Sequence, residues 1–411
     1  MLRVGGLPLV ERAVRGLLRA GVENVVVVVG YRAGPVAAVV KRIAPGRVRA
    51  VYAREWEQGN GASLAAAERV VTSDDDLFVL VTMDHLFGDG ALEQLIRTGA
   101  PAVLVDRSPQ ENVWAEGTRV RIRRGAAYAF GKTLSEEGVD CGAFLLPRDV
   151  FACQREAAAE GDHSLATALT HLARKRPLRA VSLSLQAWWQ DVDTPEDLGV
   201  AKRRLRRSLV KTSDGPVSHY LNRPLSTRVS MLIAPLGIPA DLLSFASAAL
   251  GFLAAWLLAG GAGIAGALAV HGSSVLDGVD GEVARLRLRA SGRGALLDGV
   301  LDRLVDAAVI AGLGIWALHQ GASPTTVILL IGAATAGAIL SMASKDRIAA
   351  LGLFPGPERA LGWLLGGRDG RLLLVALFSA LGLPMAALIA VTVSSGTTLV
   401  LRVASVLRRE R

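Results

Sequence analysis

The chain has 411 residues, of which 51% are hydrophobic and 20% are charged, and its formal net charge is +9. The hydrophobic content excludes a disordered chain, and long uncharged stretches in the second half argue against a wholly soluble one. Residues 1–207 carry 29 Lys+Arg and 25 Asp+Glu, whereas residues 208–411 carry 17 and 12. We therefore expect a soluble first half and a membrane-embedded second half.

The basic residues lie beside apolar stretches, as in Lys202-Arg-Arg-Leu-Arg-Arg207 and Arg408-Arg409. That placement is typical of positive-inside topology and of contact with anionic membrane lipids, and we expect no nucleic-acid partner. Cys141 and Cys153 lack CxxC spacing, so neither a disulfide framework nor a zinc site is expected.

The first half alternates helical and strand patterns. Apolar residues recur at helical spacing in Leu9–Ala20, and near-continuous apolar runs at Val25–Val29, Leu77–Met83 and Val103–Val105 indicate buried strands. Repeated helix–strand units predict a doubly wound α/β layer around a parallel sheet.

Several polar residues follow these elements. Asp84 comes directly after the second apolar run, where its carboxylate either holds Mg²⁺ on a nucleotide phosphate or caps a helix. Asp191 and Asp193 precede Thr194-Pro195-Glu196, so they are either a helix cap or a second metal-facing pair. Gly59-Asn60-Gly61-Ala-Ser63 is either a tight turn or a backbone segment that approaches a base or phosphate closely.

Five segments within about the first 200 residues match the pattern of one family: Val4-Gly-Gly-Leu-Pro-Leu-Val-Glu-Arg12, the Gly-Asn-Gly turn, Met83-Asp-His85, Asp140-Cys-Gly142 and Asp191-Val-Asp-Thr-Pro-Glu-Asp197. They resemble the sugar-phosphate nucleotidyltransferases, in particular the inositol-1-phosphate cytidylyltransferase branch. The resemblance implies one or two Mg²⁺ ions at Asp84 and at Asp191 or Asp193. It implies nucleotide contacts at Gly59, Asn60, Gly61 and Ser63, and the acceptor near Lys132 and Asp140.

Members of that family begin with a strand and a Gly-rich loop that wraps the triphosphate, before the Val-Gly-Gly-x-Pro-Leu segment. Here that segment stands at the start, as Met1-Leu-Arg-Val-Gly-Gly, so we expect the strand and the loop to be missing. Either the start codon was assigned too late, which we favour because the later motifs are present, or this half is degenerate. Without that strand and loop, the chain would lack cytidylyltransferase activity and a central strand.

The second half contains apolar stretches long enough to cross a bilayer, which takes about 17–25 residues. We expect six spans, the last two formed by Leu372–Leu407 with a break at Gly382-Leu-Pro384. Ser218–Ala234 mixes polar and apolar residues at helical spacing and predicts an interfacial amphipathic helix. An even number of spans puts both basic ends on the cytoplasmic side. The other expected spans are Leu242–Leu258, Ala262–Val275, Leu304–Leu318 and Thr325–Met342.

Four aspartates stand at the ends of these apolar helices. Asp277 and Asp280 are spaced i,i+3, and Asp298 and Asp302 are spaced i,i+4, so each pair shares one helix face. Each intramembrane Asp costs about 2.5–3.5 kcal/mol on insertion scales, so four unpaired ones are implausible as structure alone. Divalent cations would resolve the repulsion, and oxygen ligands favour Mg²⁺, Mn²⁺ or Ca²⁺ over zinc.

Small residues on the same faces either let helices pack closely or, together with the aspartates, admit a nucleotide, which we favour. Arg285 either neutralises a phosphate or extends to the membrane interface with Arg287 and Arg289. The small residues are Gly278, Gly281, Ala284 and Gly294.

The full spacing, D-x2-D-G-x2-A-R-x8-G-x3-D-x3-D, resembles the signature of the CDP-alcohol phosphotransferases over about residues 215–407. The resemblance implies an all-α six-helix transmembrane domain whose site opens to the cytoplasm. It implies two Mg²⁺ or Mn²⁺ ions held by the four aspartates, and it makes Asp302 the base that deprotonates the acceptor hydroxyl. CDP would be bound by Gly278, Gly281, Ala284, Arg285 and Gly294.

Both halves in one chain resemble the bifunctional inositol-1-phosphate cytidylyltransferase/di-myo-inositol phosphate phosphate synthase family. The implied first step makes CDP-inositol from CTP and inositol 1-phosphate. The second transfers phosphoinositol from CDP-inositol to inositol 1-phosphate and releases CMP. We expect a multi-pass protein of the cell (inner) membrane, in contact with lipids, with a cytoplasmic N-terminal domain; a homodimer is compatible with this. The expected domains are residues 1–207 (N-terminally incomplete), 208–240 (linker and amphipathic helix) and 241–411 (transmembrane).

Two other functions stay open from the sequence. A phospholipid synthase would join CDP-diacylglycerol to an inositol phosphate, but such an enzyme needs no attached cytidylyltransferase-like half. A non-enzymatic cation-binding or transport protein would use the aspartates alone, and it would not require the Gly, Ala and Arg positions of the signature.

Overall fold

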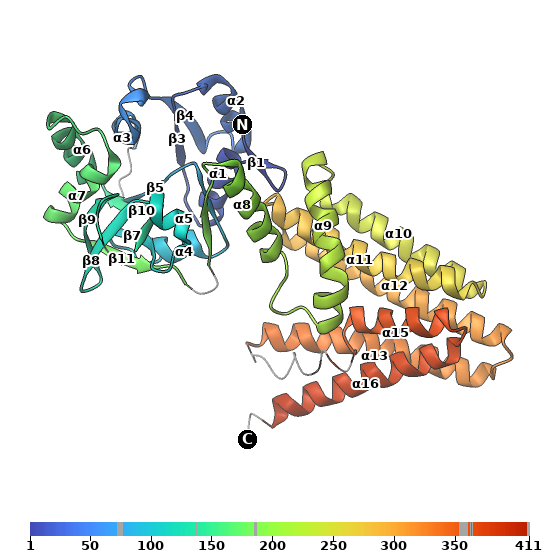
Figure 1. The fold of residues 1–411 in the computed structure, drawn as a ribbon. Coiled ribbons are helices and arrows are strands. Elements are labelled where there is room, and N and C mark those ends of the chain that lie inside the picture. Colours follow the sequence, from blue (N-terminus) through green and yellow to red (C-terminus); the bar gives the residue numbers. More distant parts are fainter. Residues whose placement is uncertain are drawn as a thin grey trace. The chain divides into compact units, whose positions relative to one another are not determined.

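Figure 1 shows a computed structural model of the chain, which forms two compact units, Met1–Leu205 and Arg206–Arg411. The structure describes residues 1–71, 77–135, 138–184, 187–352, 361, 363 and 365–408, without the side chain of Asn112. Each unit has hydrophobic clusters of its own, so each buries apolar surface within itself.

The main sheet of the N-terminal unit is mixed rather than parallel. Strand β10 runs antiparallel to both of its main neighbours, β5 and β7, while β7 and β11 are parallel. The expectation of a parallel, doubly wound sheet was therefore wrong for most of these pairs, because an apolar run indicates burial on both faces and not strand direction. The order is β5 (Leu77–Val81), β10 (Val139–Pro147), β7 (Ala102–Asp106), β11 (Leu178–Ser182), β9 (Ala126–Gly131) and β8 (Arg119–Arg123).

Three two-stranded sheets complete this unit. The all-valine strand β3 (Val25–Val29) pairs in parallel with β4 (Val48–Tyr52) as a sheet of its own, since β-branched side chains suit a half-buried strand. The strands β6 (His85–Phe87) and β12 (Trp189–Asp191) form an antiparallel pair, which sets Asp191 opposite His85. The remaining elements are β1 (Arg3–Val4), β2 (Leu7–Pro8), α1 (Leu9–Arg19), α2 (Ala33–Ile43), η1 (Trp56–Gln58), α3 (Asn60–Ala67), α4 (Ala91–Ile96), α5 (Glu111–Glu116), α6 (Asp149–Ala159), α7 (Leu165–Lys175) and α8 (Pro195–Ser208).

The second unit consists of helices and their connecting loops, with no strand among its described residues. Helix α10 packs against both α11 and α12, and α15 packs against α11 and α16 (Figure 1). Small residues permit these approaches: a Cβ on Gly312 would lie 2.4 Å from the carbonyl oxygen of Ala255, and one on Gly251 would lie 2.4 Å from Val305. The elements are η2 (Ser218–Asn222), α9 (Arg223–Ile233), η3 (Ala234–Leu236), α10 (Ala240–Ala259), α11 (Gly263–Leu286), α12 (Gly292–His319), α13 (Pro324–Ala350), α15 (Arg368–Ala380) and α16 (Pro384–Leu407).

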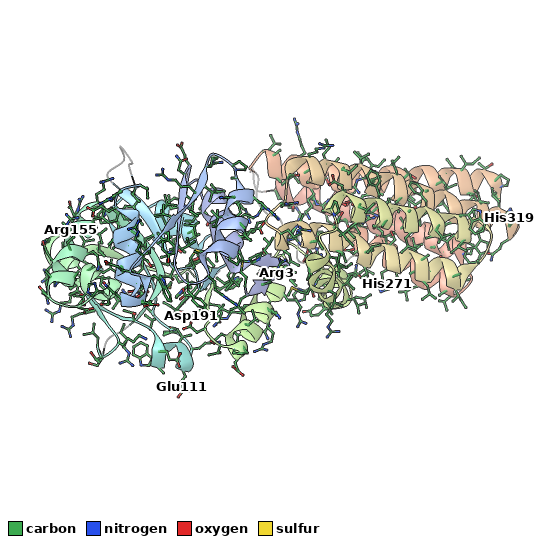
Figure 2. All side chains as sticks on the ribbon, turned by 90° about the horizontal axis from the view of Figure 1, so that it is seen from above. Arg3, Glu111, Arg155, Asp191, His271 and His319 are labelled. Carbon is green, nitrogen blue, oxygen red and sulfur yellow. The ribbon has the colours of Figure 1, made fainter. Side chains whose placement is uncertain are left out.

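Three of the described helices are long and apolar enough to cross a membrane: α10, α13 and α16. The expected count of six spans is not confirmed. Helices α11 and α12 coincide with two expected spans but extend into the acidic signature, which adds charge to them, and α15 has 13 residues. Figure 2 shows His319 at the end of the helical unit where α12 ends. Asp298 and Asp302 lie in the first half of the same helix.

Candidate active sites

Four signature aspartates converge between α11 and α12. Carboxylate oxygens of Asp277, Asp298 and Asp302 lie within 4.8 Å of one another. Asp280 accepts hydrogen bonds from Ser244 Oγ and from the Gly281 backbone N–H, and its carboxyl group neighbours that of Asp298. Two helical spacings, i,i+3 on α11 and i,i+4 on α12, thus produce one acidic cluster.

An arginine that was not predicted from the sequence, Arg368, lies within this cluster. Arg368, the first residue of α15, places Nη1 2.7 Å from Asp277 Oδ2 and Nη2 2.9 Å from Asp302 Oδ1. Behind it, Asp306 Oδ1 lies 3.4 Å from Arg368 Nε, and Asp306 Oδ2 accepts a 2.8 Å hydrogen bond from Arg371 Nη2. Of these additional residues, only Asp306 could have been suspected from the sequence, because it continues the i,i+4 spacing of Asp298 and Asp302 on the same helix face.

Two of the predicted CDP-binding glycines lie against arginine side chains. A Cβ on Gly278 would lie 2.7 Å from Arg223 Nη1, and one on Gly281 would lie 3.2 Å from Arg285 Nη1. Arg285 itself donates to the Leu209 carbonyl oxygen at 3.3 Å, within the segment that precedes α9. Gly294 lies in the first turn of α12, where its N–H donates to the capping hydroxyl of Ser291 at 3.1 Å. Ala284 is half-buried on α11.

Glu282, inside the signature, binds α9 to α11. Its fully buried carboxylate accepts from Arg223 Nη1 at 2.7 Å, from Ser226 Oγ at 2.7 Å and from Ser230 Oγ at 2.6 Å. Arg223 also forms a two-fold ion pair with Asp214, at 2.9 and 3.1 Å. Burial of an ion pair is tolerable only when its remaining hydrogen-bonding groups are satisfied, as they are here. Helix α9 therefore presents a polar face to the protein.

Several apolar side chains of the α9 region (residues 218–236) are exposed, although Val229 and Ile233 pack against Leu243, Val279 and Val283. The side chains of Leu225 and Leu232 are 45% and 75% exposed, and Tyr220 and Leu236 are each 71% exposed. The segment therefore buries its serines in the protein and leaves part of its apolar surface for the surroundings.

The N-terminal unit has a second acidic cluster. Asp84 and Asp191 lie together with His85, their ligand atoms within 4.8 Å of one another. Pairing of β12 with β6 sets Asp191 opposite His85, and His85 Nδ1 lies 2.6 Å from Asp84 Oδ1. The ring of His85 also stacks on Trp189, with centroids 5.1 Å apart. His85 was not predicted as a site residue, although it directly follows Asp84 in Met83-Asp-His85.

Gly142 brings β10 against this cluster. Its φ is +67°, and a Cβ there would lie 2.1 Å from Thr82 Oγ1, so another residue would push the two strands apart. The Gly142 N–H donates to Asp140 Oδ1 at 2.9 Å, and Thr82 N–H donates to the Gly142 carbonyl oxygen at 2.9 Å. Asp140, the expected acceptor-binding residue, is thereby fixed near the strand end that precedes Asp84.

Burial and charge shift the pKa values in this cluster. Burial raises the pKa of Asp140 to about 6. Burial, together with the charges of Asp193 and Asp84, raises the pKa of Asp191 to about 6. Burial alone would raise the pKa of Asp84, but the hydrogen bond and charge of His85 lower that pKa below its usual value. Burial alone would lower the pKa of His85, but the hydrogen bond and charge of Asp84 raise that pKa above its usual value.

The other predicted residues of this half are placed differently. Asp193 is exposed and outside the cluster that contains Asp191, and Lys132 is exposed in the turn after β9. Asn60 Oδ1 accepts from the Leu165 N–H at 2.7 Å, and the Gly61 N–H donates to the His163 carbonyl oxygen at 2.9 Å. The turn at Gly59–Gly61 thus packs against the start of α7, with Ser63 half-buried on α3.

Two family models match the chain, one over each half. The MobA-like NTP transferase domain matches residues 1–186, and CDP-alcohol phosphatidyltransferase matches residues 238–407. A bifunctional IPC transferase and DIPP synthase from Rubrobacter xylanophilus is 37% identical over 417 residues, covering all of this chain and 92% of that protein. The chain belongs to the bifunctional IPC transferase and DIPP synthase family. It is thus a transferase with a nucleotidyltransferase half and a CDP-alcohol phosphotransferase half, as the sequence analysis predicted.

Other members and one solved structure are also similar. The bifunctional IPC transferase and DIPP synthase of Thermococcus kodakarensis is 32% identical over 324 residues, which is 78% of this chain and 72% of that protein. The solved structure of the inositol-1-phosphate CTP transferase from T. maritima is 21% identical, with a TM-score of 0.42, and covers 49% of this chain and 83% of its own.

Proposed function

We propose that this family member transfers phosphoinositol from CDP-inositol to inositol 1-phosphate, releasing CMP and making phosphorylated di-myo-inositol phosphate. The N-terminal unit would supply CDP-inositol from CTP and inositol 1-phosphate. The observation that carries the proposal is the convergence of Asp277, Asp298 and Asp302 within 4.8 Å, beside Asp280. Membership of the bifunctional family supports the choice of substrates.

The acidic cluster of the helical unit fits divalent cations. It offers carboxylate oxygens alone, which are the ligands that Mg²⁺ and Mn²⁺ prefer, and it gathers them from two facing helices. We assign Asp277, Asp280, Asp298 and Asp302 to two such ions. When bound, divalent cations neutralise the diphosphate of a CDP-alcohol and make CMP a better leaving group.

Asp302 is the residue that takes the proton from the acceptor hydroxyl. Its Oδ1 is paired with Arg368, so Oδ2 would serve both roles assigned to Asp302: one of its lone pairs would face the cation, and the other would accept the proton. The hydroxyl oxygen then bonds to the phosphorus that carries the inositol of CDP-inositol. The bond from that phosphorus to the bridging oxygen breaks, and CMP leaves with the electron pair.

The signature residues between the aspartates would hold the donor nucleotide. Gly278 and Gly281 leave room on α11 for the guanidinium groups of Arg223 and Arg285, Ala284 adds little bulk, and Gly294 lies in the first turn of α12. Arg285 is held by a single carbonyl oxygen in the interactions described, so a phosphate would be a stronger partner for its guanidinium.

The N-terminal cluster also fits a divalent cation. Asp191 Oδ1 is buried and has no hydrogen-bond partner among the described residues, which is costly unless something binds it. We assign one or two ions to Asp84 and Asp191, with Asp193 as the weaker candidate. The CTP would contact Gly59, Asn60, Gly61 and Ser63, and inositol 1-phosphate would lie near Lys132 and Asp140.

We place the helical unit in the cell membrane, with six spans and a cytoplasmic N-terminal unit. Three helices of sufficient length and apolarity support a membrane location. The exposed apolar side chains of the α9 region, opposite its buried serines, support an interfacial position for that helix.

Labelled substrates test the proposed function. Membranes containing the protein are incubated with inositol 1-phosphate and either labelled CDP-inositol or labelled CDP-diacylglycerol. We expect a water-soluble labelled product from CDP-inositol, together with CMP. Product in the organic phase from CDP-diacylglycerol, with none from CDP-inositol, would show a phospholipid synthase instead.

A further inference from the structure

The position of Arg368 is explained by the acidic cluster and not by its own helix. It is the first residue of α15, where the helix dipole disfavours a cation. Its side chain is nevertheless only 9% exposed and forms ion pairs with Asp277 and Asp302. The free energy that holds Arg368 there must therefore come from the acidic side chains around it, which include Asp306 as well as Asp277 and Asp302.

Arg368 engages one oxygen of each carboxylate. The pairs use Oδ2 of Asp277 and Oδ1 of Asp302, at 2.7 and 2.9 Å. A carboxylate offers two oxygens and about four lone-pair sites. The second oxygen of each aspartate is not engaged by Arg368 and can still coordinate a cation, so the ion pairs and coordination are compatible.

Arg368 is itself held from behind. Asp306 lies 3.4 Å from Arg368 Nε, and Arg371 Nη2 donates to the other oxygen of Asp306 at 2.8 Å. Arg371 also donates to the Gly366 carbonyl oxygen at 2.8 Å. The side chains of Asp306 and Arg371 are 7% and 3% exposed. The chain of alternating charges from Arg371 to the cluster is therefore buried and fixes the guanidinium in place.

We propose that Arg368 is a positioning residue that holds Asp277 and Asp302, which lie on different helices, at the spacing a divalent cation needs. Asp306 and Arg371 fix Arg368 in turn. The proposal rests on the cation-binding role assigned above to the cluster. Two carboxylates on facing helices repel each other, and a planar guanidinium can bridge them through two separate nitrogens. Partners of this kind orient metal ligands, and their loss typically weakens metal binding about 10–100-fold.

If only the positive charge of Arg368 mattered, removing Arg368 would change cation binding in the opposite direction. Arg368 adds one positive charge beside four aspartates, so removing it would strengthen cation binding if it only repelled or displaced the cation. The sign of the change therefore separates a positioning residue from a competing one.

The experiment titrates Mn²⁺ into the purified full chain in detergent and follows unbound Mn²⁺ by electron paramagnetic resonance. The Asp84→Ala background removes a ligand of the N-terminal cluster, so that the helical unit dominates the titration. Arg368→Gln is expected to weaken Mn²⁺ binding about 10-fold or more. Arg368→Lys keeps the charge but cannot bridge two carboxylates through a planar fork, so it should also bind less tightly than the starting protein.

Arg303→Gln is the matched control. Arg303 Nη1 lies 3.9 Å from Asp302 Oδ2, so this variant removes a charge from the same neighbourhood without removing a bridge. Its Mn²⁺ affinity should stay within about 3-fold of the starting protein, well inside the loss expected for an orienting partner. Equal or tighter Mn²⁺ binding by Arg368→Gln would overturn the proposal.

A second variant covers the case in which Arg368→Gln does not fold. Asp306→Asn keeps Arg368 but removes the negative charge that pairs with Arg368 and Arg371. It should weaken Mn²⁺ binding by a smaller factor than Arg368→Gln does. Unchanged affinity in Asp306→Asn would then overturn the proposal. If the starting protein binds no Mn²⁺, the proposed function fails as well; if it binds Mn²⁺ and Arg368→Gln binds equally, only the positioning role fails.

Discussion

The two acidic sites are assembled by different means. In the N-terminal unit, main-chain pairing of β6 with β12 sets Asp191 opposite His85, and Val192 N–H donates to the Asp84 carbonyl oxygen at 3.1 Å. Helices α11 and α12 use their own N–H and C=O groups internally, so only side chains can join them. There, Arg368 links Asp277 to Asp302. The sheet site is thus fixed by backbone, whereas the helical site depends on a side-chain ion pair.

If the two sites are chemically independent, the largest effect should come from the proposed base of the helical site. Asp302→Asn is expected to lower phosphoinositol transfer about 10²–10⁴-fold, the usual contribution of a general base. The measurement is CMP release from supplied CDP-inositol. CMP release at the normal rate would exclude Asp302 as the base. CDP-inositol formation, measured in the same preparation, should not change.

The converse substitution should affect the sheet site only. Asp84→Ala is expected to lower CDP-inositol formation by more than about 100-fold, because loss of a metal ligand should exceed the loss of an outer partner. Pyrophosphate release from CTP and inositol 1-phosphate is the readout. Transfer from supplied CDP-inositol should be unaffected. An equal fall in both reactions would mean that the two sites are not separate.

Dependence of the helical unit on side chains can be tested away from the cluster. Glu282→Gln removes the carboxylate that pairs with Arg223, which then retains Asp214. We expect a loss of about 2 kcal/mol in the free energy of unfolding, as for a hydrogen bond to a charged group. Thermal unfolding in detergent measures it. The control is Asp346→Asn, an exposed carboxylate on α13, which should change little. Equal stability of the two variants would contradict the anchoring role of Glu282.

The smallest effect separates two neighbouring aspartates of the sheet site. Asp191 is in the cluster and Asp193 is exposed outside it. Asp191→Asn should therefore weaken Mn²⁺ binding by the N-terminal site, while Asp193→Asn should leave it within about 3-fold, less than the usual cost of losing an outer partner. The opposite order of the two variants would move the metal site to Asp193.

The sequence predicted the acidic cluster because its spacing is a direct consequence of helix geometry. Asp277 with Asp280, and Asp298 with Asp302, had to share helix faces once the segments were helical. The two halves and their family membership were confirmed as well, since the signature and the N-terminal segments were specific. Which helix faces meet is a tertiary property, but four costly charges gave a reason to expect that they converge.

Arg368 and the sheet direction could not be predicted in the same way. Arg368 is remote in sequence from Asp277 and Asp302, and no periodic pattern relates it to them. Its place at the start of a helix even opposes the usual preference for acidic residues there. Strand β10 (Val139–Pro147) was not predicted, since Asp140 and Gly142 interrupt its apolar residues. The apolar runs of β5 and β7 indicated burial but carried no information on strand direction.

The central claim, that the carboxylates between α11 and α12 bind divalent cations for transfer, is tested most directly by CMP release as a function of Mg²⁺. The purified chain is supplied with CDP-inositol and inositol 1-phosphate, with Asp298→Asn in parallel. We predict that CMP release requires Mg²⁺, stops on chelation and is lost in Asp298→Asn. Release that persists in the chelator, or that proceeds equally in Asp298→Asn, would contradict the account.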